Sequence, residues 1–227
     1  MNIAIIMAAG AGKRMRSDTP KQFLLLRGKP VIVHTLEKFQ NCAGIDKIIV
    51  VCAKGYIDQC KELAEQYNIT KCCAVIPGGA ERYDSSRNGI AEAEKVSGGC
   101  GEDTFVLIHD AARPFVSEEI INENVRAAKL YGACETAVAM NDTVVLGNDG
   151  FSEKTVPRDN LYRVQTPQSF RLDVITDAFR SFDPERDGPV TDDATLVLRR
   201  GGRVAIVQGS ALNIKITTPD DLGFFET

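Results

Sequence analysis

The chain has 227 residues, of which 44% are hydrophobic and 26% charged, which suits a single α/β domain spanning residues 1–227. Its formal net charge of −4 argues against a nucleic-acid-binding surface, which normally shows a basic excess or stripe. No stretch approaches the roughly 20 consecutive apolar residues of a membrane span, and the first strand signal leaves no room for a signal peptide, so we expect a cytoplasmic protein without membrane partners.

The first element is a short apolar run at residues 3–7, which is followed abruptly by small residues at 8–12. The run has the length of a strand that is buried on both faces. Small residues after it leave backbone N–H groups free to approach a ligand closely, as a phosphate cradle requires. Cations follow, among them Lys13, Arg14 and Lys21, so the stretch predicts a triphosphate site. A glycine-rich turn with a solvated basic flank would explain this stretch alone equally well.

Two better-known phosphate loops do not match this stretch. A P-loop requires a glycine and a magnesium-binding hydroxyl where the chain has Met7 and Arg14. A dinucleotide fingerprint requires a third glycine where Met15 stands, and an acidic residue after the second strand, which ends at residues 51–54 without one. Both of these nucleotide-binding motifs are therefore excluded.

Strand and helix signals alternate from here to about residue 140. We expect strands at 47–52, 74–76, 104–108 and 133–140, and helices at 31–39, 57–67, 81–95 and 117–130. This order predicts a Rossmann-like three-layer α/β domain, in which helices cover both faces of a mostly parallel mixed sheet. Because ligands bind at the carboxyl ends of such strands, the loops after Met7, Ile76 and Ile108 should meet around one pocket.

Two of these loops carry candidate ligand-binding residues. Gly78 and Gly79 lead into the helix that contains Ser85, which suits a base or a phosphate, although an ordinary capped turn explains the pattern as well. Asp110 follows the fourth strand, where a carboxylate is well placed to hold Mg²⁺ bridged to phosphate oxygens. The alternative, that Asp110 caps the next helix, is less favoured by its position.

From residue 141 the pattern changes to that of a β-hairpin, with strands at 142–146 and 151–156 on either side of a Gly-Asn-Asp-Gly turn. A two-stranded hairpin is marginally stable alone in water, so it must lie against something. An arm of this length, about residues 141–158, predicts a two-fold homodimer.

The last third of the chain mixes short elements. We expect a strand at 161–164, a turn at 166–168, a helix near 172–179, a charged loop at 183–189, a helix opened by residues 191–193 and a strand at 203–207. Lys215 then lies in an apolar strand just before a helix cap. A lysine in such a run is costly to bury, so it needs an anion from the chain or from a ligand.

Cysteine and histidine usage argues against protein-only metal sites. The seven cysteines are scattered through apolar segments without CxxC spacing, and in a reducing compartment they are expected to be small buried hydrophobes. The chain has only two histidines, His34 and His109, which makes a histidine-based metal site improbable.

Seven motifs occur in order: AAGAGKRM, PKQF, GGAER with Ser85, HDAARP, QTPQ, TDDA and NIKITTPDDL. Together they resemble the 2-C-methyl-D-erythritol 4-phosphate cytidylyltransferases of isoprenoid biosynthesis, and also the closely related ribitol 5-phosphate cytidylyltransferases. The likeness runs from residue 3 to about residue 226. It implies transfer of CMP from CTP to a sugar-alcohol phosphate with release of pyrophosphate, Mg²⁺ or another divalent cation as cofactor, and a homodimer.

The resemblance also implies roles for individual residues. Those lining the nucleotide site would be Ala8, Ala9, Gly10, Gly79, Ser85, Asp110 and Ala111, with Asp110 also beside the metal. Those stabilising the charged phosphates as the catalytic set would be Arg14, Lys21, Lys215 and Arg158. Those handling the acceptor would be Arg113, Thr143, Arg158 and Lys215, and in the family Thr143 and Arg158 come from the partner's arm.

A few residues differ from the family pattern at positions that bear on which acceptor is used. Residues 157–158 and 161–162 are closer to the ribitol phosphate group, whereas Ala112, residues 192–193 and residues 81–85 favour methylerythritol phosphate. We therefore predict 2-C-methyl-D-erythritol 4-phosphate as the acceptor and keep D-ribitol 5-phosphate as the alternative. A catalytically silent CTP-binding subunit is a remoter alternative, because a mere binder would not need the full cation set. Use of UTP or GTP stays open, because base choice depends on backbone contacts.

Overall fold

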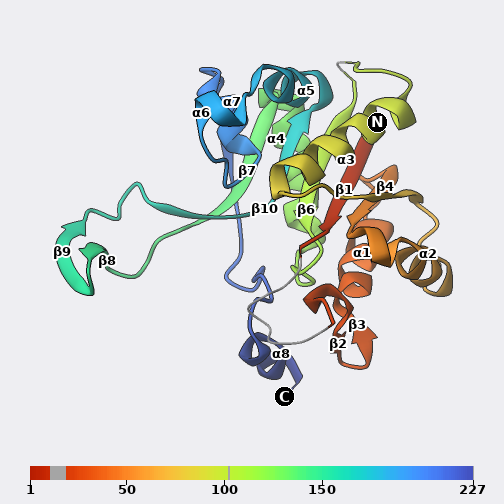
Figure 1. The fold of residues 1–227 in the computed structure, drawn as a ribbon, viewed down its shortest axis with the longest axis horizontal. Coiled ribbons are helices and arrows are strands. Elements are labelled where there is room, and N and C mark those ends of the chain that lie inside the picture. Colours follow the sequence, from red (N-terminus) through yellow and green to blue (C-terminus); the bar gives the residue numbers. More distant parts are fainter. Residues whose placement is uncertain (11–18, 102, 227) are drawn as a thin grey trace.

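The computed structural model describes residues 1–10, 19–101 and 103–226, and it contains a seven-stranded sheet with helices on both faces (Figure 1). Across the sheet the strands are β11 (Ala205–Gln208), β7 (Ala133–Ala139), β10 (Tyr162–Arg171), β6 (Phe105–Asp110), β1 (Asn2–Ala8), β4 (Lys47–Cys52) and β5 (Cys72–Pro77). Only β10 runs antiparallel to its neighbours in this described sheet. The predicted three-layer α/β fold with a mostly parallel mixed sheet is confirmed.

In the part of the chain that the structure describes, three helices cover each face of the sheet. On one face lie α1 (Val31–Asn41), α2 (Ile57–Gln66) and α4 (Glu118–Tyr131), and on the other lie α3 (Arg82–Ser97), α5 (Leu172–Ser181) and α7 (Ala194–Arg199). The α4 helix begins as predicted, because the hydroxyl of Ser117 accepts a hydrogen bond from the backbone N–H of Ile120 at 3.2 Å. Among the described residues, no helix has the length and apolarity that crossing a membrane requires.

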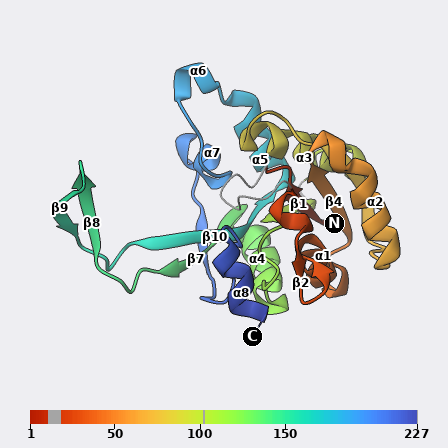
Figure 2. The same ribbon diagram turned by 60° about the horizontal axis from the view of Figure 1, so that its bottom comes forward.

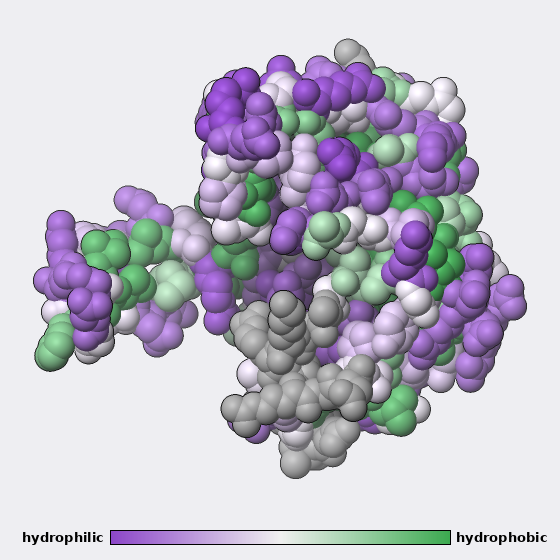
Figure 3. All heavy atoms as spheres, viewed as in Figure 1, coloured by the Kyte–Doolittle hydropathy of each residue, from purple (hydrophilic) through white to green (hydrophobic). Residues whose placement is uncertain are grey.

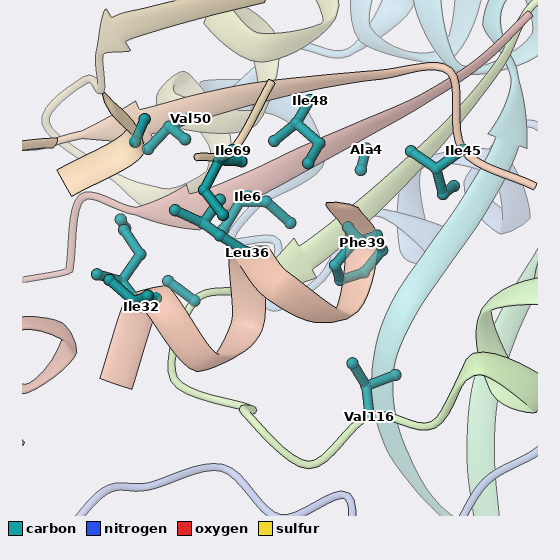
Figure 4. Close-up of a cluster of buried hydrophobic side chains, with 14 of the residues drawn as sticks. Ala4, Ile6, Ile32, Leu36, Phe39, Ile45, Ile48, Val50, Ile69 and Val116 are labelled. Carbon is teal, nitrogen blue, oxygen red and sulfur yellow. The ribbon is translucent and has the colours of Figure 1, made fainter. Parts of the chain in front are cut away.

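Alternate residues of the central strands feed two separate cores, because successive side chains point to opposite faces. Ile6 and Ile48 pack with Leu36 and Phe39 of α1 on one face (Figure 4). Residues of β1 and β4 with the other parity pack against α3 and α5. Burial on both faces explains why these strands are continuous apolar runs rather than alternating patterns.

Gly89 allows α3 to lie unusually close to β1. A Cβ atom at this position would lie 2.6 Å from Cγ2 of Ile5 and 3.1 Å from Cγ2 of Val51, closer than packed side chains approach each other. The absence of a side chain therefore lets the helix that begins beside the cavity pack directly on the two central strands.

β10 differs from the prediction, because residues 166–168 do not form a turn that ends a strand. The strand runs on to Arg171, and its register with β7 shifts between Val164 and Gln168, around a cis Thr166–Pro167 peptide bond. The proline suggested a break, but the partners β6 and β7 on either side keep the segment in the sheet.

The C-terminal segment also differs in part. Residues 213–217 form no strand, and the expected charged loop contains a short helix, α6 (Pro184–Asp187). Ile216 is fully buried against Leu26 and Val31. The segment therefore packs against these residues and does not extend the sheet as a further strand. The remaining elements are α8 (Pro219–Glu226), β2 (Leu25–Leu26), β3 (Lys29–Pro30) and the 3₁₀ helices η2 (Lys21–Phe23) and η3 (Lys54–Tyr56).

All seven cysteines are free. Those that are buried as expected are Cys42, Cys52, Cys60 and Cys134. The prediction of burial is wrong for Cys73 and Cys100, which are exposed because Cys73 lies on the edge strand β5 and Cys100 follows the end of α3.

The predicted hairpin is formed by β8 (Val144–Asn148) and β9 (Phe151–Val156), and it stands away from the main body (Figures 1 and 2). Apolar side chains gather on it (Figure 3), among them Leu146, which is 56% exposed, and Phe151, which is 78% exposed. A hairpin with so much exposed apolar surface lacks a core of its own. Its role in dimerisation stays a prediction.

Candidate active site

A cavity of about 430 Å³ opens at the carboxyl edge of the central strands. The loops after β1, β5 and β6 line it together with the segment around Lys215, so the expected meeting of the three loops is confirmed. Of the residues predicted for the site, the structure brings these to the cavity: Ala8, Ala9, Gly10, Lys21, Gly79, Ser85, Asp110, Ala111 and Lys215. Arg14 lies outside the described residues.

The loop after β1 is held by a glutamine that the sequence did not single out. The buried amide of Gln22 donates to the carbonyl oxygens of Ala8 at 2.6 Å and Gly10 at 3.3 Å. The C=O and N–H groups of a trans peptide point in opposite directions, so fixing the Ala8 carbonyl also fixes the direction of the Ala9 N–H group. The PKQF motif was the available signal for this role.

The loop after β5 approaches the loop after β1 so closely that only glycine fits. A Cβ atom on Gly78 would lie 2.5 Å from Cβ of Ala9, in the loop after β1, and 2.7 Å from the hydroxyl oxygen of Ser85. Gly79 N–H donates to that oxygen at 3.0 Å, and the hydroxyl donates to the Glu81 carbonyl at 3.1 Å. Glu81 N–H also donates to the Asp84 carboxylate at 3.3 Å, which is the helix-capping hydrogen bond of an ordinary capped turn. The loop is therefore both a capped turn and part of the cavity wall.

Asp110 is the acidic centre of the cavity. Its Oδ2 atom lies 2.9 Å from Nζ of Lys215 and 3.4 Å from Nε of Arg113, and its side chain is 11% exposed. Burial alone would raise the pKa of this carboxyl, but the positive charges of Lys215, Arg82 and Arg113 hold the pKa well below its usual value. Asp110 therefore stays ionised. It does not cap the next helix, because Ser117 caps α4.

Lys21 contacts the segment 213–217, which carries Lys215. Lys21 Nζ donates to the carbonyl oxygen of Ile216 at 2.7 Å, and Ile216 N–H donates to the carbonyl of Ala112 at 2.8 Å. The anion that Lys215 was expected to need is Asp110. Two cations from opposite ends of the chain are thus held on one short segment beside the cavity.

Arg82 is a further cation of the cavity wall, and its partner comes from far along the chain. Its guanidinium donates to Asp193 at 2.6 Å, and the Asp193 side chain is only 2% exposed. The amide oxygen of Gln168 accepts from the backbone N–H of Asp193 at 2.9 Å, which fixes that residue. No role was predicted for these three residues, although each stands in a motif of the resemblance (GGAER, TDDA and QTPQ).

The arrangement at Asp110 fits a divalent cation that is shared with a ligand. Mg²⁺ is usually bound by one or two carboxylates, with phosphate oxygens and water completing its octahedron. Asp110 is ionised, lines the cavity, and makes both of its ion pairs through Oδ2. In the described parts of the chain, no three His, Cys, Asp or Glu side chains gather as a metal site. Phosphate oxygens would therefore supply the other ligands.

Thr143 and Arg158 are not brought to this cavity within one chain. Both are exposed at the base of the arm, and neither lines the cavity. Arg158 donates to the carbonyl of Asn141, on the other side of the arm. Arg113 does adjoin the site, through Asp110 and through a hydrogen bond to the carbonyl of Asn213 at 2.8 Å.

His109 supports the loop after β6 from inside the core. Its Nε2 atom lies 3.2 Å from the carbonyl oxygen of Arg113, and its Nδ1 atom lies 3.1 Å from the hydroxyl of Thr166. Burial lowers the pKa of His109 to about 4, so the imidazole is neutral at neutral pH. It holds the chain on either side of Asp110 in place without carrying charge.

Replacing His109 should flatten the pH dependence of stability. A histidine with a folded pKa of about 4 and an unfolded pKa of 6.5 stabilises the fold above pH 6.5 and loses this contribution as the pH falls towards 4. Between about pH 7 and about pH 5 this accounts for about 2 kcal/mol of unfolding free energy. In His109→Gln, urea unfolding should show that much less decline. An unchanged slope would contradict the assignment, and His34→Gln is the control for removing a histidine elsewhere.

Comparison with known proteins agrees with this geometry. The family model "IspD: 2-C-methyl-D-erythritol 4-phosphate cytidylyltransferase" matches residues 2–227. The 2-C-methyl-D-erythritol 4-phosphate cytidylyltransferase of Clostridium acetobutylicum is 42% identical over 230 residues, covering 100% of this chain and 96% of that protein. The solved 4-diphosphocytidyl-2C-methyl-D-erythritol synthase of Anaerococcus prevotii has a TM-score of 0.82 at 31% identity, covering 99% and 94% of the two chains. The corresponding cytidylyltransferase of Francisella tularensis has a TM-score of 0.81 at 33% identity, covering 98% and 97%. The chain therefore belongs to the 2-C-methyl-D-erythritol 4-phosphate cytidylyltransferase family.

Proposed function

We propose that this protein transfers CMP from CTP to 2-C-methyl-D-erythritol 4-phosphate and releases pyrophosphate. The observation that carries the proposal is the cavity that joins Lys21 and Lys215 to the ionised Asp110 and to the two glycine-containing loops, in a chain of this family. The names of the family and of its relatives favour this acceptor over D-ribitol 5-phosphate. The presence of the cations and the acid together makes a silent binding subunit the weaker alternative.

The reaction needs charge and positioning more than proton transfer. A phosphate oxygen of the acceptor forms a bond with the α-phosphorus of CTP, and the bond from that phosphorus to the bridging oxygen of the leaving pyrophosphate breaks. The attacking oxygen is already anionic, so no strong general base is required. Negative charge accumulates on the α-phosphate and on the pyrophosphate, where fixed cations stabilise the transition state.

We assign the nucleotide to the loops after β1 and β5. The backbone of residues 8–10, held through Gln22, would take the phosphates, and the Gly79–Ser85 hydrogen-bonded turn would take the base. Asp110 and Ala111 would lie beside the ribose and the metal. A divalent cation on Asp110 would neutralise charge on the triphosphate oxygens.

We assign the transferring phosphates to the cations. Lys21 is hydrogen-bonded to the segment that carries Lys215 beside the cavity, and Arg14 completes this set by the resemblance alone. The acceptor phosphate would lie towards Arg113, which is held by Asp110 and Asn213.

A second copy would complete the acceptor side. We propose a homodimer in which the arm of one chain brings Thr143 and Arg158 to the cavity of the other. The exposed apolar residues of the arm support this, because they need a partner surface, and so does the position of Arg158 outside its own chain's cavity. We also propose a cytoplasmic location, which seven free cysteines support, because thiols persist in reducing compartments.

Pyrophosphate release with CTP and Mg²⁺ tests the proposal, with 2-C-methyl-D-erythritol 4-phosphate and D-ribitol 5-phosphate compared as acceptors. We expect the first to be preferred by more than about tenfold in kcat/KM, or ~1.4 kcal/mol. A preference for ribitol phosphate would contradict the acceptor assignment. Binding of CTP without turnover of either acceptor would favour the silent-subunit alternative. UTP and GTP in place of CTP test the base.

Removing either lysine should reduce turnover with little effect on folding. Lys21→Ala and Lys215→Ala should each lower kcat by at least about 10²-fold, because each removes a positive charge from the region where phosphate charge develops. Lys29→Ala is the matched control, because Lys29 pairs with Glu37 at 2.7 Å and does not line the cavity. Near-normal turnover in either variant would remove that lysine from the catalytic set.

Mixing two inactive variants should restore activity if Arg158 acts across the dimer. Lys215→Ala and Arg158→Ala damage residues that would belong to different chains at one cavity, so mixed dimers would hold one intact site. After exchange of subunits, a one-to-one mixture should recover roughly a quarter of the parent activity. No recovery despite subunit exchange would contradict action in trans.

The same mixture also tests the arm. Among the described residues of the arm, Phe151 is the most exposed large apolar side chain. Phe151→Ser should weaken the dimer in sedimentation, and introduced into both variants it should abolish the recovery of activity in the mixture. Leu212→Ser is the matched control, because Leu212 is 65% exposed but lies outside the arm. A parent protein that sediments as a monomer would contradict the homodimer.

A further inference from the structure

One peptide group beside the cavity is held at both of its ends. It joins Ile216 to Thr217, in the segment that carries Lys215. Its C=O accepts from Nζ of Lys21 at 2.7 Å, and its N–H donates to Oδ2 of Asp221 at 2.7 Å. Because a peptide group is planar, a change in the direction of its N–H also changes the direction of its C=O. Asp221 and Lys21 are therefore coupled through a single amide.

Asp221 makes more hydrogen bonds than the capping of α8 requires. It lies in the first turn of this helix, where a carboxylate can accept from the N–H of the residue that precedes the helix. That bond is present, from the N–H of Thr218 at 2.9 Å. The same oxygen also accepts from the N–H of Thr217 at 2.7 Å and from its hydroxyl at 2.9 Å. These two bonds lead away from the helix, to a residue of the cavity wall.

Asp221 carries its negative charge in this position. Partial burial alone would raise the pKa of the carboxyl, but the hydrogen bonds from Thr217 and Thr218 lower the pKa by more, so the group stays ionised. A carboxylate at the N–H end of an amide polarises that amide and makes its C=O a stronger acceptor. Here the C=O accepts from an ammonium group. The two opposite charges, on Asp221 and on Lys21, therefore strengthen each other's hydrogen bond to the amide.

We propose that Asp221 is a positioning residue that holds Lys21 in the cavity through the Ile216–Thr217 peptide group. The inference rests on the proposed function. Lys21 lines the described cavity and Asp221 does not, so Asp221 acts through the lysine rather than on a substrate. A lysine ammonium sits on a flexible four-carbon stem, so its position depends on the acceptor that holds it. A misplacement by about 1 Å is enough to lower a rate by about 10²-fold.

Asp221→Ala and Asp220→Ala remove the same charge from adjacent residues of α8. We expect Asp221→Ala to lower kcat by about 10- to 100-fold while the KM for CTP changes less than about threefold, because the lysine acts on charge that develops in the transition state. Asp220→Ala is the matched control and should keep kcat within about twofold, because Asp220 is exposed and does not line the described cavity. Parent-like kcat in Asp221→Ala would overturn the inference.

Double-mutant cycles test whether the effect passes through Lys21. In Lys21→Ala, the further change Asp221→Ala should alter the residual kcat by less than about twofold, because the group that Asp221 positions is already absent. In Lys215→Ala, the same change should still lower kcat by about tenfold or more. A loosening of the whole segment would predict the same loss in both backgrounds. Effects that multiply in full with Lys21→Ala would overturn the inference.

A crystal structure of Asp221→Ala gives a readout that does not need an active enzyme. We expect Lys21 Nζ to leave the Ile216 carbonyl oxygen, which it contacts at 2.7 Å in the parent. An unchanged contact would overturn the inference. Should the alanine variant fail to fold, Asp221→Asn keeps the shape of the side chain without its charge, and parent-like kcat with an unchanged contact would again overturn it.

Failure of the inference and failure of the proposed function give different results. A parent protein that turns over no acceptor contradicts the proposed function, and the crystal structure of the variant still decides whether Asp221 positions Lys21. An active parent with an equally active Asp221→Ala variant contradicts the role of Asp221 alone.

Discussion

The buried carboxylate of Asp110 is the interaction on which the rest of this site depends. An ionised acid in a low-dielectric position is stable only if cations compensate it, and here Lys215 and Arg113 contact it directly while Arg82 acts at longer range. Arg113 and Arg82 are in turn held by other segments of the chain, at Asn213 and at Asp193. The requirement to satisfy one buried charge therefore draws the loops after β5 and β6 and the C-terminal segment to one edge of the sheet.

The same charges suit the proposed chemistry. A site for a triphosphate needs several cations close together, and their mutual repulsion without a ligand has to be offset. Asp110 offsets it in the free protein, and a divalent cation bound there would leave Lys215 for the phosphates. β10 supplies the support behind this centre, through Thr166 for Asp110 and through Gln168 for the segment that holds Arg82.

Much of this arrangement is visible in the sequence because it depends on local patterns. Apolar runs at 47–52 and 104–108 identify strands buried on both faces. Because the carboxyl ends of parallel strands lie at the same edge of a sheet, the loops that follow such strands are expected to lie close together. The turn expected at 166–168 fails because the hydrogen-bonding partners on both sides of β10 outweigh a local proline signal. The strand expected around Lys215 fails because Lys215 lines the cavity while Ile216 packs against Leu26 and Val31 and hydrogen-bonds to Ala112. Pairs such as Arg82 and Asp193, 111 residues apart, leave no local pattern at all.

A crystal structure of the protein with CTP and Mg²⁺ would test the central role of Asp110 most directly. The account predicts a triphosphate between the backbone of residues 8–10 and Lys215, with a cation bound jointly by the phosphates and by the Asp110 carboxylate. A nucleotide bound elsewhere, or a triphosphate beyond the reach of both Asp110 and Lys215, would contradict it.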